Sequence, residues 1–578
     1  MNVLELSEQE IGRRQSLQEL RAMGIDPYPA AEYPTNAFST DIKNEYKEGE
    51  KREVVIAGRM MTRRVMGKAS FAELQDSKGR IQVYITRDDI CPRDNKELYN
   101  TVFKRLLDIG DFIGVEGFVF KTQTGEISVH AKSLTVLSKS LKPLPIVKYK
   151  DGVAYDRFDD PELRYRQRYV DLVVNDGVKE TFLKRAIILR TMRQILDDAG
   201  YTEVETPTLQ NIAGGASARP FITHFNALNV DMYMRIATEL YLKRLIVGGF
   251  EGVYEIGKNF RNEGMDRTHN PEFTCIELYV QYKDYNWMMK FTENMLERIC
   301  IAVNGKPEQM IDGQLVSFKA PYRRLPILDA IKEKTGYDLN GKTEEEIRSI
   351  CKKLEMDGID DTMGKGKLID EIFGEFCEST FIQPTFIIDY PVEMSPLTKM
   401  HRSKPGLTER FELMVNGKEL ANAYSELNDP IDQEERFVEQ MKLADKGDDE
   451  AMVIDQDFLR ALQYGMPPTS GIGIGIDRLV MLMTGKTTIQ EVLFFPQMKP
   501  EKKIPKSSVE EWKAIGIPEE WVPVFNKAGY NLVSDIKAEK AQKLQMEVCG
   551  INKKYKLGYD NPKVEEFQTW IDKATEKG

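Results

Sequence analysis

The sequence predicts an α+β protein in which a small N-terminal β-barrel precedes a larger domain built on an antiparallel sheet flanked by helices, followed by a small helical extension. Five short strand patterns separated by turns fill residues 54–137, as expected for the barrel. Two longer strand patterns, 253–260 and 273–281, enclose a polar loop containing Gly, Asn and Pro. A helical pattern over 181–199 ends at Gly200, a common helix stop.

Length and composition limit the class of protein. A chain of 578 residues exceeds one ordinary core, so we expect two or three domains. It has no run of 18 apolar residues and begins with an acidic segment, which predicts a cytoplasmic protein without membrane attachment. Six scattered cysteines without a C-x-x-C pair, and only four histidines, argue against a zinc site or a disulfide framework.

The charge is distributed unevenly. The net charge is −11, which argues against a protein coated in basic surface. Residues 43–150 nevertheless carry 21 Lys and Arg against 14 Asp and Glu, a local charge of +7. A polyanion should therefore be steered first to the N-terminal region.

Shifts in composition predict the domain boundaries. We expect an N-terminal helix and connector at 1–42, the barrel at 43–142, a linker at 143–165, the large domain at 166–499 with a charged helical insertion at about 325–380, and the helical extension at 500–578. The extension carries 14 basic and 13 acidic residues. This balance favours a helical docking module over a second RNA-binding element.

The barrel combines basic residues with aromatic ones. That mixture suits an OB-fold, which stacks single-stranded bases on aromatic side chains. A barrel alone is a weak indication of function, because outward-facing strand residues are often merely solvated.

The two long strands predict a functional face. Alternation places Arg261 and Glu263 on one side, and Phe273, Glu277 and Tyr279 with Cys275 on one side of the returning strand. Phe273 and Glu277 are then roughly 13 to 14 Å apart, about the span of an adenylated amino acid with a long side chain. Any one of these residues could be a surface charge or part of the core, but together they indicate a site.

The run F-R-N-E, a loop, and H-N-P-E-F closely resembles motif 2 of the class II aminoacyl-tRNA synthetases, and the flanking residues resemble the lysine-specific members. The helix over 181–199 with Y-T-E-V-E-T-P-T-L resembles motif 1, which implies a homodimer through that motif. G-I-G-I-G-I-D-R resembles motif 3. Its glycines, Gly471, Gly473 and Gly475, share one strand face that a nucleotide can approach.

The resemblance implies roles in ATP binding. Arg261 would bridge the α-phosphate and the substrate carboxylate, Glu263 would receive the adenine amino group, and Phe273 would stack the ring. The implied ATP-binding set is Arg261, Glu263, His269, Asn270, Phe273, Gly475 and Arg478, of which Arg261, Glu263 and Arg478 are the catalytic residues. Many relatives carry Arg directly before H-N-P-E-F, whereas this chain has Thr268, so the γ-phosphate contact stays open.

Asn416-Gly417 is a strong hairpin pattern. It places Glu419 opposite Met414 with Glu412 diagonal on the same face, and two converging carboxylates suit Mg²⁺. The resemblance assigns both to two or three magnesium ions that act with ATP. The spacing from Glu419 to Asn422 breaks strand alternation, so we expect a bulge near Ala421.

The small-residue loop 212–221 would close over the amino acid, and the implied lysine-binding set is Gly214, Glu239, Arg261, Glu277, Tyr279, Asn422 and Glu426. Two carboxylates and a phenol suit the ammonium group of a long chain, which favours L-lysine, whereas a pocket for an anionic side chain should carry cations. An aspartyl- or asparaginyl-type synthetase of the same subclass, or a non-catalytic RNA-binding relative, are the alternatives.

For the barrel, the resemblance implies an anticodon-binding domain for tRNA(Lys). Phe71 would stack an anticodon base, and the implied contacts to base edges or backbone are Arg59, Gln82 and Glu126. The implied reaction is attack of the amino-acid carboxylate on ATP, with transfer of the aminoacyl group to tRNA. The nucleophile, with a reference pKa of about 3.5, is already ionised at pH 7 and needs no general base.

Overall fold

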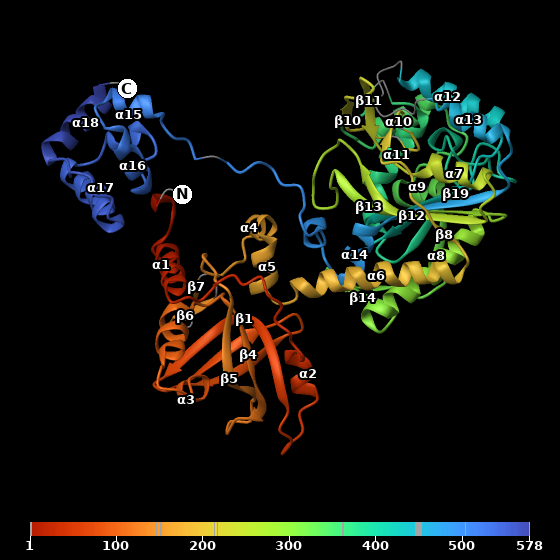
Figure 1. Cartoon of the computed structure of the whole chain (residues 1–578). Helices are drawn as coiled ribbons and strands as arrows, with labels where there is room; N and C mark the ends of the chain where they lie inside the picture. Colours follow the sequence, from red (N-terminus) through yellow and green to blue (C-terminus); the bar gives the residue numbers. More distant parts are fainter. Residues whose placement is uncertain are drawn as a thin grey trace. The chain divides into compact units, whose positions relative to one another are not determined.

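The computed structural model describes residues 3–145, 147–150, 153–155, 157–212, 214–216, 218–360, 363–444, 454–502 and 504–576. It divides into two compact units, Met1–Arg157 with Lys499–Gly578, and Phe158–Met498. Figure 1 colours the elements along the chain.

The N-terminal part of the first unit is a closed five-stranded barrel, which confirms the predicted OB fold. In its second and third strands every other residue is buried, because successive side chains point to opposite sides of the sheet. The strands, in the order β1-β2-β3-β5-β4, are β1 (Glu53–Met66), β2 (Ala69–Gln75), β3 (Arg80–Thr86), β4 (Phe112–Lys121) and β5 (Ile127–Ser138).

Helix α1 (Glu8–Ala22) packs on the barrel and begins at a capping box of Ser7 and Glu10. Its buried Arg13 donates hydrogen bonds to the carbonyls of Ile109 and Ser140, at 2.9 and 3.0 Å. The remaining elements here are α2 (Ser39–Asn44), α3 (Arg87–Ile90), a π-helix (Leu98–Leu106), β6 (Lys148–Lys150) and β7 (Val153–Tyr155).

The C-terminal extension is helical, as predicted, and has its own apolar core around Trp512 and Phe525. Leu4, from the 3-10 turn Val3–Glu5, packs into that core. Its helices are α15 (Val509–Ala514), α16 (Val522–Lys527), α17 (Ala541–Tyr555) and α18 (Val564–Glu576), with 3-10 turns Glu519–Trp521 and Val533–Ile536.

The second unit is built on an eight-stranded sheet of order β16-β17-β18-β19-β20-β13-β12-β8. Its central pairs are antiparallel as predicted, but the sheet is mixed, because β16 pairs with β17 and β8 with β12 in parallel. The strands are β8 (Thr202–Glu203), β12 (Gly252–Phe260), β13 (Glu272–Gln281), β16 (Arg323–Pro326), β17 (Thr385–Ile388), β18 (Arg410–Val415), β19 (Lys418–Ser425) and β20 (Thr469–Gly475).

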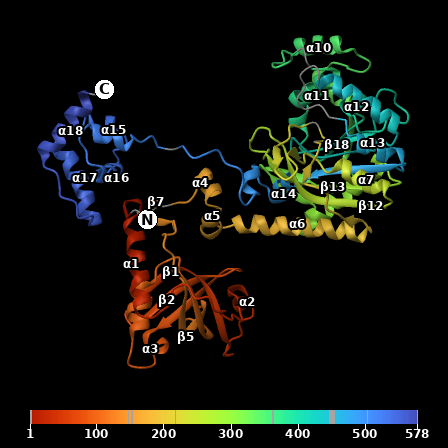
Figure 2. The ribbon, with the colours of Figure 1, turned by 45° about the horizontal axis from the view of Figure 1, so that its top comes forward.

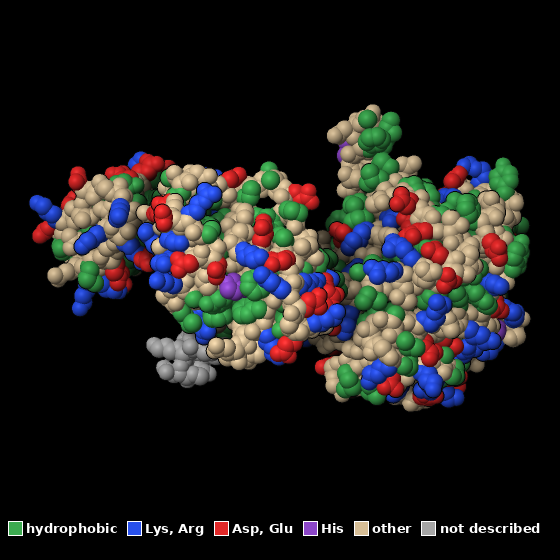
Figure 3. Space-filling view, turned by 60° about the horizontal axis from the view of Figure 1, so that its bottom comes forward, with side chains coloured by type: hydrophobic (Ala, Val, Ile, Leu, Met, Phe, Trp, Pro, Cys, Tyr) green, Lys and Arg blue, Asp and Glu red, His purple; other side chains and the backbone are tan. Residues whose placement is uncertain are grey.

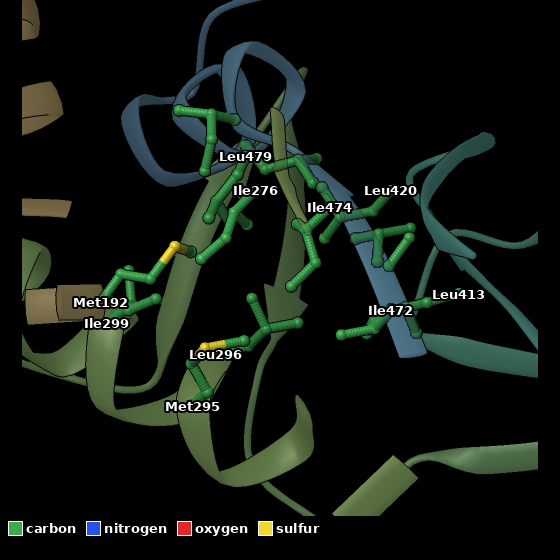
Figure 4. Close-up of a cluster of buried hydrophobic side chains, with 14 of the residues drawn as sticks. Met192, Ile276, Met295, Leu296, Ile299, Leu413, Leu420, Ile472, Ile474 and Leu479 are labelled. Carbon is green, nitrogen blue, oxygen red and sulfur yellow. The ribbon is translucent and has the colours of Figure 1, made fainter. Parts of the chain in front are cut away.

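Strand β20 separates the core from the site. Ile472 and Ile474 point into the apolar core, where helices α6 (Val178–Asp198) and α8 (Tyr285–Asn304) supply Met192, Leu296 and Ile299 (Figure 4). The alternate residues are the glycines, which therefore lie on the opposite face of the sheet. Figures 1 and 2 both show α6 running along one side of this unit.

Two local predictions can be compared with the structure. The run Y-T-E-V-E-T-P-T-L predicts a strand after Gly200 that is closed by Pro207, but only Thr202–Glu203 pairs with β12. A second short strand, β9 (Leu209–Gln210), follows Pro207, which has no N–H to donate. The hairpin register is as predicted, with Met414 opposite Glu419 and Leu413 opposite Ala421. Leu420 therefore has no residue opposite it on β18, and it forms the bulge that was expected near Ala421.

Three helices between β16 and β17 enclose a separate apolar core and correspond to the expected helical insertion. Two of them, α10 and α11, are labelled in Figure 2. They are α9 (Ile327–Thr335), α10 (Glu344–Lys353) and α11 (Lys365–Phe376). The other elements of this unit are α4 (Pro161–Arg166), α5 (Arg168–Val174), α7 (Glu239–Val247), α12 (Pro430–Ala444), α13 (Gln456–Gln463), α14 (Ile476–Thr484), β10 (Ile222–Phe225), β11 (Val230–Met234), β14 (Glu308–Ile311) and β15 (Gln314–Ser317), with 3-10 turns Glu378–Thr380, Val392–Met394 and Ile489–Glu491. None of the helices among the described residues is both long and apolar enough to cross a membrane.

Candidate active site

The site lies on the glycine face of the sheet, where β20 runs between β13 and β19. Two cross-strand rows span these strands, one of Tyr279, Gly471 and Tyr424 and one of Glu277, Gly473 and Asn422. Because the middle residue of each row has no side chain, the outer residues can flank a hollow whose floor is the β20 backbone.

Of the three glycines on β20, Gly471 has the least space. A Cβ atom there would lie 2.2 Å from the Glu426 Oε1 atom and 2.4 Å from the Tyr279 ring. At Gly473 the nearest atom to such a Cβ is the Glu277 Cγ, at 3.8 Å, an ordinary contact. A side chain at position 471 would therefore collide with Glu426 and Tyr279 as they are placed.

Glu277 is held from two elements. The backbone N–H of Thr238 donates to its Oε1 atom at 3.1 Å, and the Tyr279 hydroxyl donates to its Oε2 atom at 2.9 Å. Burial, with the charge of Glu239 as a second cause, raises the pKa of Glu277. The carboxylate is thus fixed in place but lacks a direct cationic partner among the described residues, a state that favours a bound cation.

A second group contains a residue that the sequence prediction missed. Lys243, on α7, is completely buried and donates to Glu239 at 2.6 Å while forming an ion pair with Glu426. The Tyr424 hydroxyl donates to Glu239 at 2.6 Å. Lys243 follows Glu239 by four residues, a helical spacing that places both on one face, so its contact with Glu239 could have been anticipated.

The small-residue loop approaches the start of α7. A Cβ atom on Gly214 would lie 2.9 Å from Leu240, and one on Gly215 would lie 3.4 Å from the Glu239 Cβ. The loop therefore runs next to Glu239, which belongs to the implied lysine-binding set. Ala213 and Ser217 of this loop lie outside the described residues.

The ATP-binding candidates of motif 2 begin one residue after β12. The strand ends at Phe260, so Arg261 and Glu263 lie in the loop rather than sharing a strand face as expected. The Arg261 guanidinium lies over the Phe273 ring at 5.2 Å, and its buried Nε atom has no hydrogen-bond partner among the described residues. Glu263 accepts a hydrogen bond from the backbone of Arg219 at 3.3 Å. Arg261 thus has a donor free for a ligand.

Arg478 and His269 meet, although 209 positions separate them in the chain. The Arg478 guanidinium contacts the His269 Nε2 atom at 2.9 Å and donates to the Glu419 carbonyl at 2.6 Å. His269 also pairs through Nδ1 with Asp266, at 2.8 Å. Burial would raise the pKa of Asp266, but hydrogen bonds from Thr268 and His269 outweigh it and hold this pKa below its usual value. The loop is thereby ordered without an Arg at position 268.

Two other ATP candidates have structural partners. The Asn270 amide donates to the Glu272 carbonyl and to Gln497, both at 2.6 Å, so this side chain holds the loop. Gly475 precedes α14 and pairs with Cys275, which places the helix N-terminus and Arg478 at the end of the glycine strand.

The candidate magnesium ligands lie close to Arg410, a cation that the sequence analysis did not single out. Arg410 donates to Glu412 at 2.6 Å and to Asn422 at 3.1 Å. Burial, opposed by Arg410 and reinforced by Glu419, raises the pKa of Glu412 to about 7. Within the described part of the chain, no three His, Cys, Asp or Glu side chains are arranged to hold a metal. Glu412 and Glu419 fit a divalent cation only if phosphates complete its coordination.

The anticodon candidates lie on the outer surface of the barrel. One cross-strand row contains Phe71, Tyr84, His130 and Phe118. The next contains Gln82, Ser128 and Phe120, and Ser128 donates to Gln82 at 2.9 Å. The prediction missed Tyr84, His130, Phe118 and Phe120, which extend the row of aromatic side chains beside Phe71.

The other two anticodon candidates are already paired. Arg59 donates to the Gly110 carbonyl at 2.9 Å and lies over the Phe112 ring. Glu126 forms an ion pair with Lys43 at 3.1 Å. RNA contacts by these two side chains would require exchange of these partners.

Comparisons with known proteins agree with this architecture. Residues 160–499 match the family described as tRNA synthetases class II (D, K and N), and residues 54–137 match the OB-fold nucleic acid binding domain. The chain is 64% identical over 573 residues to a protein of Porphyromonas gingivalis named "Lysine--tRNA ligase", covering 99% of each chain. A protein of the same name from Azobacteroides pseudotrichonymphae is 65% identical over 498 residues, 86% of this chain and 99% of the relative.

The fold and the site define a class II aminoacyl-tRNA synthetase, and the chain belongs to the D, K and N group of that class. Within this group it belongs to the lysine–tRNA ligase family. The match to the Azobacteroides relative covers nearly all of that protein and 86% of this chain.

Proposed function

We propose that this chain activates L-lysine with ATP, releases pyrophosphate, and transfers the lysyl group to the 3′ end of tRNA(Lys). The pocket formed by Glu277, Glu426 and Tyr279 carries this proposal. All three side chains are more than nine-tenths buried, and buried carboxylates beside a phenol suit an ammonium group. The names of the relatives, "Lysine--tRNA ligase", agree with that choice.

The activation step would be catalysed mainly by positioning and by charge neutralisation. The lysine carboxylate attacks the α-phosphorus of ATP and displaces pyrophosphate, with Arg261 between the two reacting groups. Its unpartnered buried Nε atom and its place next to Phe273 support that role. Phe273 would stack the adenine, Glu263 would receive its amino group, and Gly214 would close the pocket behind the amino acid.

The distal phosphates would meet Arg478 and His269, which already lie together. The pair Glu412 and Glu419 would hold Mg²⁺ with these phosphates. When bound, the ion neutralises charge on the phosphates of ATP. The raised pKa of Glu412 supports this assignment, because a carboxylate that is costly to ionise alone is stabilised by a cation.

The barrel would bind the anticodon of tRNA(Lys). Phe71 and Tyr84, whose rings are 5.0 Å apart, offer a stacking surface, and Gln82 lies in the neighbouring row. Lys51 and Lys132 lie over Phe118, at 4.7 and 5.6 Å, and add positive charge to the surface. Basic and acidic side chains are otherwise interspersed on the face shown in Figure 3.

A homodimer through motif 1 is part of the proposal. Apolar side chains stay exposed on α6 and on the β10–β11 hairpin of the same unit, with Leu183 at 56%, Ile222 at 64% and Leu228 at 67% exposure. Such side chains suit burial against a second copy. Sedimentation of the full chain would give twice its 66.4 kDa mass.

The deciding experiment is ATP–pyrophosphate exchange with each of the twenty amino acids. We expect exchange with lysine and at least a hundredfold less with aspartate or asparagine, because those side chains leave the pocket carboxylates unpaired. Exchange driven by aspartate would favour the sibling synthetases. No exchange with any amino acid, together with retained tRNA binding, would favour a non-catalytic RNA-binding relative.

A further inference from the structure

Lys243 lies among the candidate carboxylates and carries the same charge as the side chain of the expected substrate. It is fully buried on α7, and its ammonium bridges Glu239 of the same helix and Glu426, which follows β19. The rings of Tyr424 and Phe458 lie 5.5 and 5.8 Å from its Nζ atom. An ammonium so enclosed is a permanent part of the pocket.

We infer that Lys243 is a positioning residue that supplies the fixed counter-charge of the amino-acid pocket and so matches the remaining negative charge to a substrate with two ammonium groups. This inference rests on the proposed lysine pocket. Its carboxylates are Glu239, Glu277 and Glu426, three negative charges when ionised. With Lys243 this group carries −2, which the α- and ε-ammonium groups of lysine balance, while the substrate carboxylate pairs with Arg261 as proposed above.

The three carboxylates differ in their hydrogen-bond partners. Glu239 is held by Lys243 and by the Tyr424 hydroxyl. Glu277 is held by the Tyr279 hydroxyl and the Thr238 N–H, neither of which carries charge. Neither oxygen of Glu426 has a well-aligned hydrogen bond among the described residues, although Lys243 lies beside it. Glu277 and Glu426 are thus the carboxylates open to a second ammonium group.

The charge state agrees with this division. Burial alone would lower the pKa of Lys243, but Glu239 and Glu426 more than offset burial, and Lys243 stays protonated. Burial raises the pKa of Glu426 well above its usual value, Lys243 lowers it, and Glu239 and Glu277 raise it. Without Lys243, Glu426 would take up a proton more readily and lose its attraction for the substrate. The other titratable groups facing this cluster are Tyr279 and Tyr424.

The test is Lys243→Met in the full chain, assayed by lysine-dependent pyrophosphate exchange. We expect the KM for lysine to rise by roughly ten- to hundredfold, with the KM for ATP within about twofold. The acid limb of the pH profile of kcat/KM for lysine should move to higher pH. The matched control is Arg244→Met on the same helix, whose guanidinium pairs instead with Asp455 and Asp457. A lysine KM within twofold of wild type, or an unmoved acid limb, would overturn the inference.

A second variant tests whether Lys243 acts through Glu426, and serves if Lys243→Met alone does not fold. Combining Lys243→Met with Glu426→Gln removes one charge of each sign and restores the balance. We expect kcat/KM for lysine in the double variant to lie within about threefold of its value in Glu426→Gln alone. The losses caused by the two single substitutions are then coupled and do not multiply. Multiplied losses would refute the inference. Unchanged lysine kinetics in Glu277→Gln would refute the lysine pocket itself. That result can be told apart from a failure of the inference about Lys243 alone.

Discussion

Replacing Glu277 by Gln tests the basis of amino-acid choice most directly. The variant keeps the size and shape of a side chain that is 7% exposed, but removes its charge. One side-chain amide must then face both the Thr238 N–H, at 3.1 Å, and the Tyr279 hydroxyl, at 2.9 Å. It can no longer form a charge-assisted hydrogen bond to the substrate ammonium.

Loss of such a bond, with a poorly matched buried amide left behind, is worth about 2 to 4 kcal/mol. At 1.4 kcal/mol per decade this corresponds to roughly thirtyfold to several hundredfold in kcat/KM for lysine. The affinity for ATP should change little, since Glu277 lies four residues along β13 from Phe273. Pyrophosphate exchange at varied lysine and varied ATP measures both.

The pH dependence of kcat/KM for lysine gives an independent test, because the direction of its shift can be predicted. The charge of Glu277 is one cause of the raised pKa of Glu426, so removing it should lower the pKa of Glu426. Lysine binding requires the ionised carboxylate, so the acid limb of kcat/KM should move to lower pH, opposite to the shift expected for Lys243→Met. The matched control is Glu272→Gln at the start of β13, which pairs with Lys258. Unchanged lysine kinetics in Glu277→Gln would refute the pocket.

Three further predictions concern the rest of the chain. Arg261→Ala and Arg478→Ala should each slow pyrophosphate exchange by about 3 to 4 kcal/mol of activation free energy with the melting temperature little changed, and wild-type exchange would exclude that residue from the mechanism. Residues 158–498 alone, if they fold, should retain lysine-dependent exchange but lose most tRNA charging, because the barrel supplies anticodon affinity rather than chemistry; equal loss of both activities would contradict this division. Gly471→Ala should reduce stability by about 1 to 3 kcal/mol through its 2.2 and 2.4 Å contacts, whereas Gly473→Ala should cost much less, and equal melting temperatures would show that the site relaxes freely.

The features that could be predicted from the sequence are those with a local cause. Glycines at every second position of β20 must share one face of a strand, and the alternating isoleucines must share the other. Asn416 and Gly417 both adopt positive φ, at 52° and 71°, which is the turn that an Asn-Gly pair favours. That turn fixes the register of Met414 against Glu419, so the extra residue could be expected near Ala421. In each case a rule spanning a few residues was sufficient.

The features that could not be predicted depend on contacts between distant segments. The sequence shows Lys243 one helical turn after Glu239, which alone describes an ordinary helix pair worth a few tenths of a kcal/mol. Its importance comes from Glu426, which the sheet brings from 183 positions away to the same ammonium group. Arg410 is similar, because its contact with Asn422 requires the β18–β19 pairing. Considered by itself, the buried Lys243 argues against a pocket for lysine, because it carries the same charge as the substrate side chain. Counted with all three carboxylates, the same cation leaves two negative charges unbalanced, which is the number of ammonium groups that lysine carries.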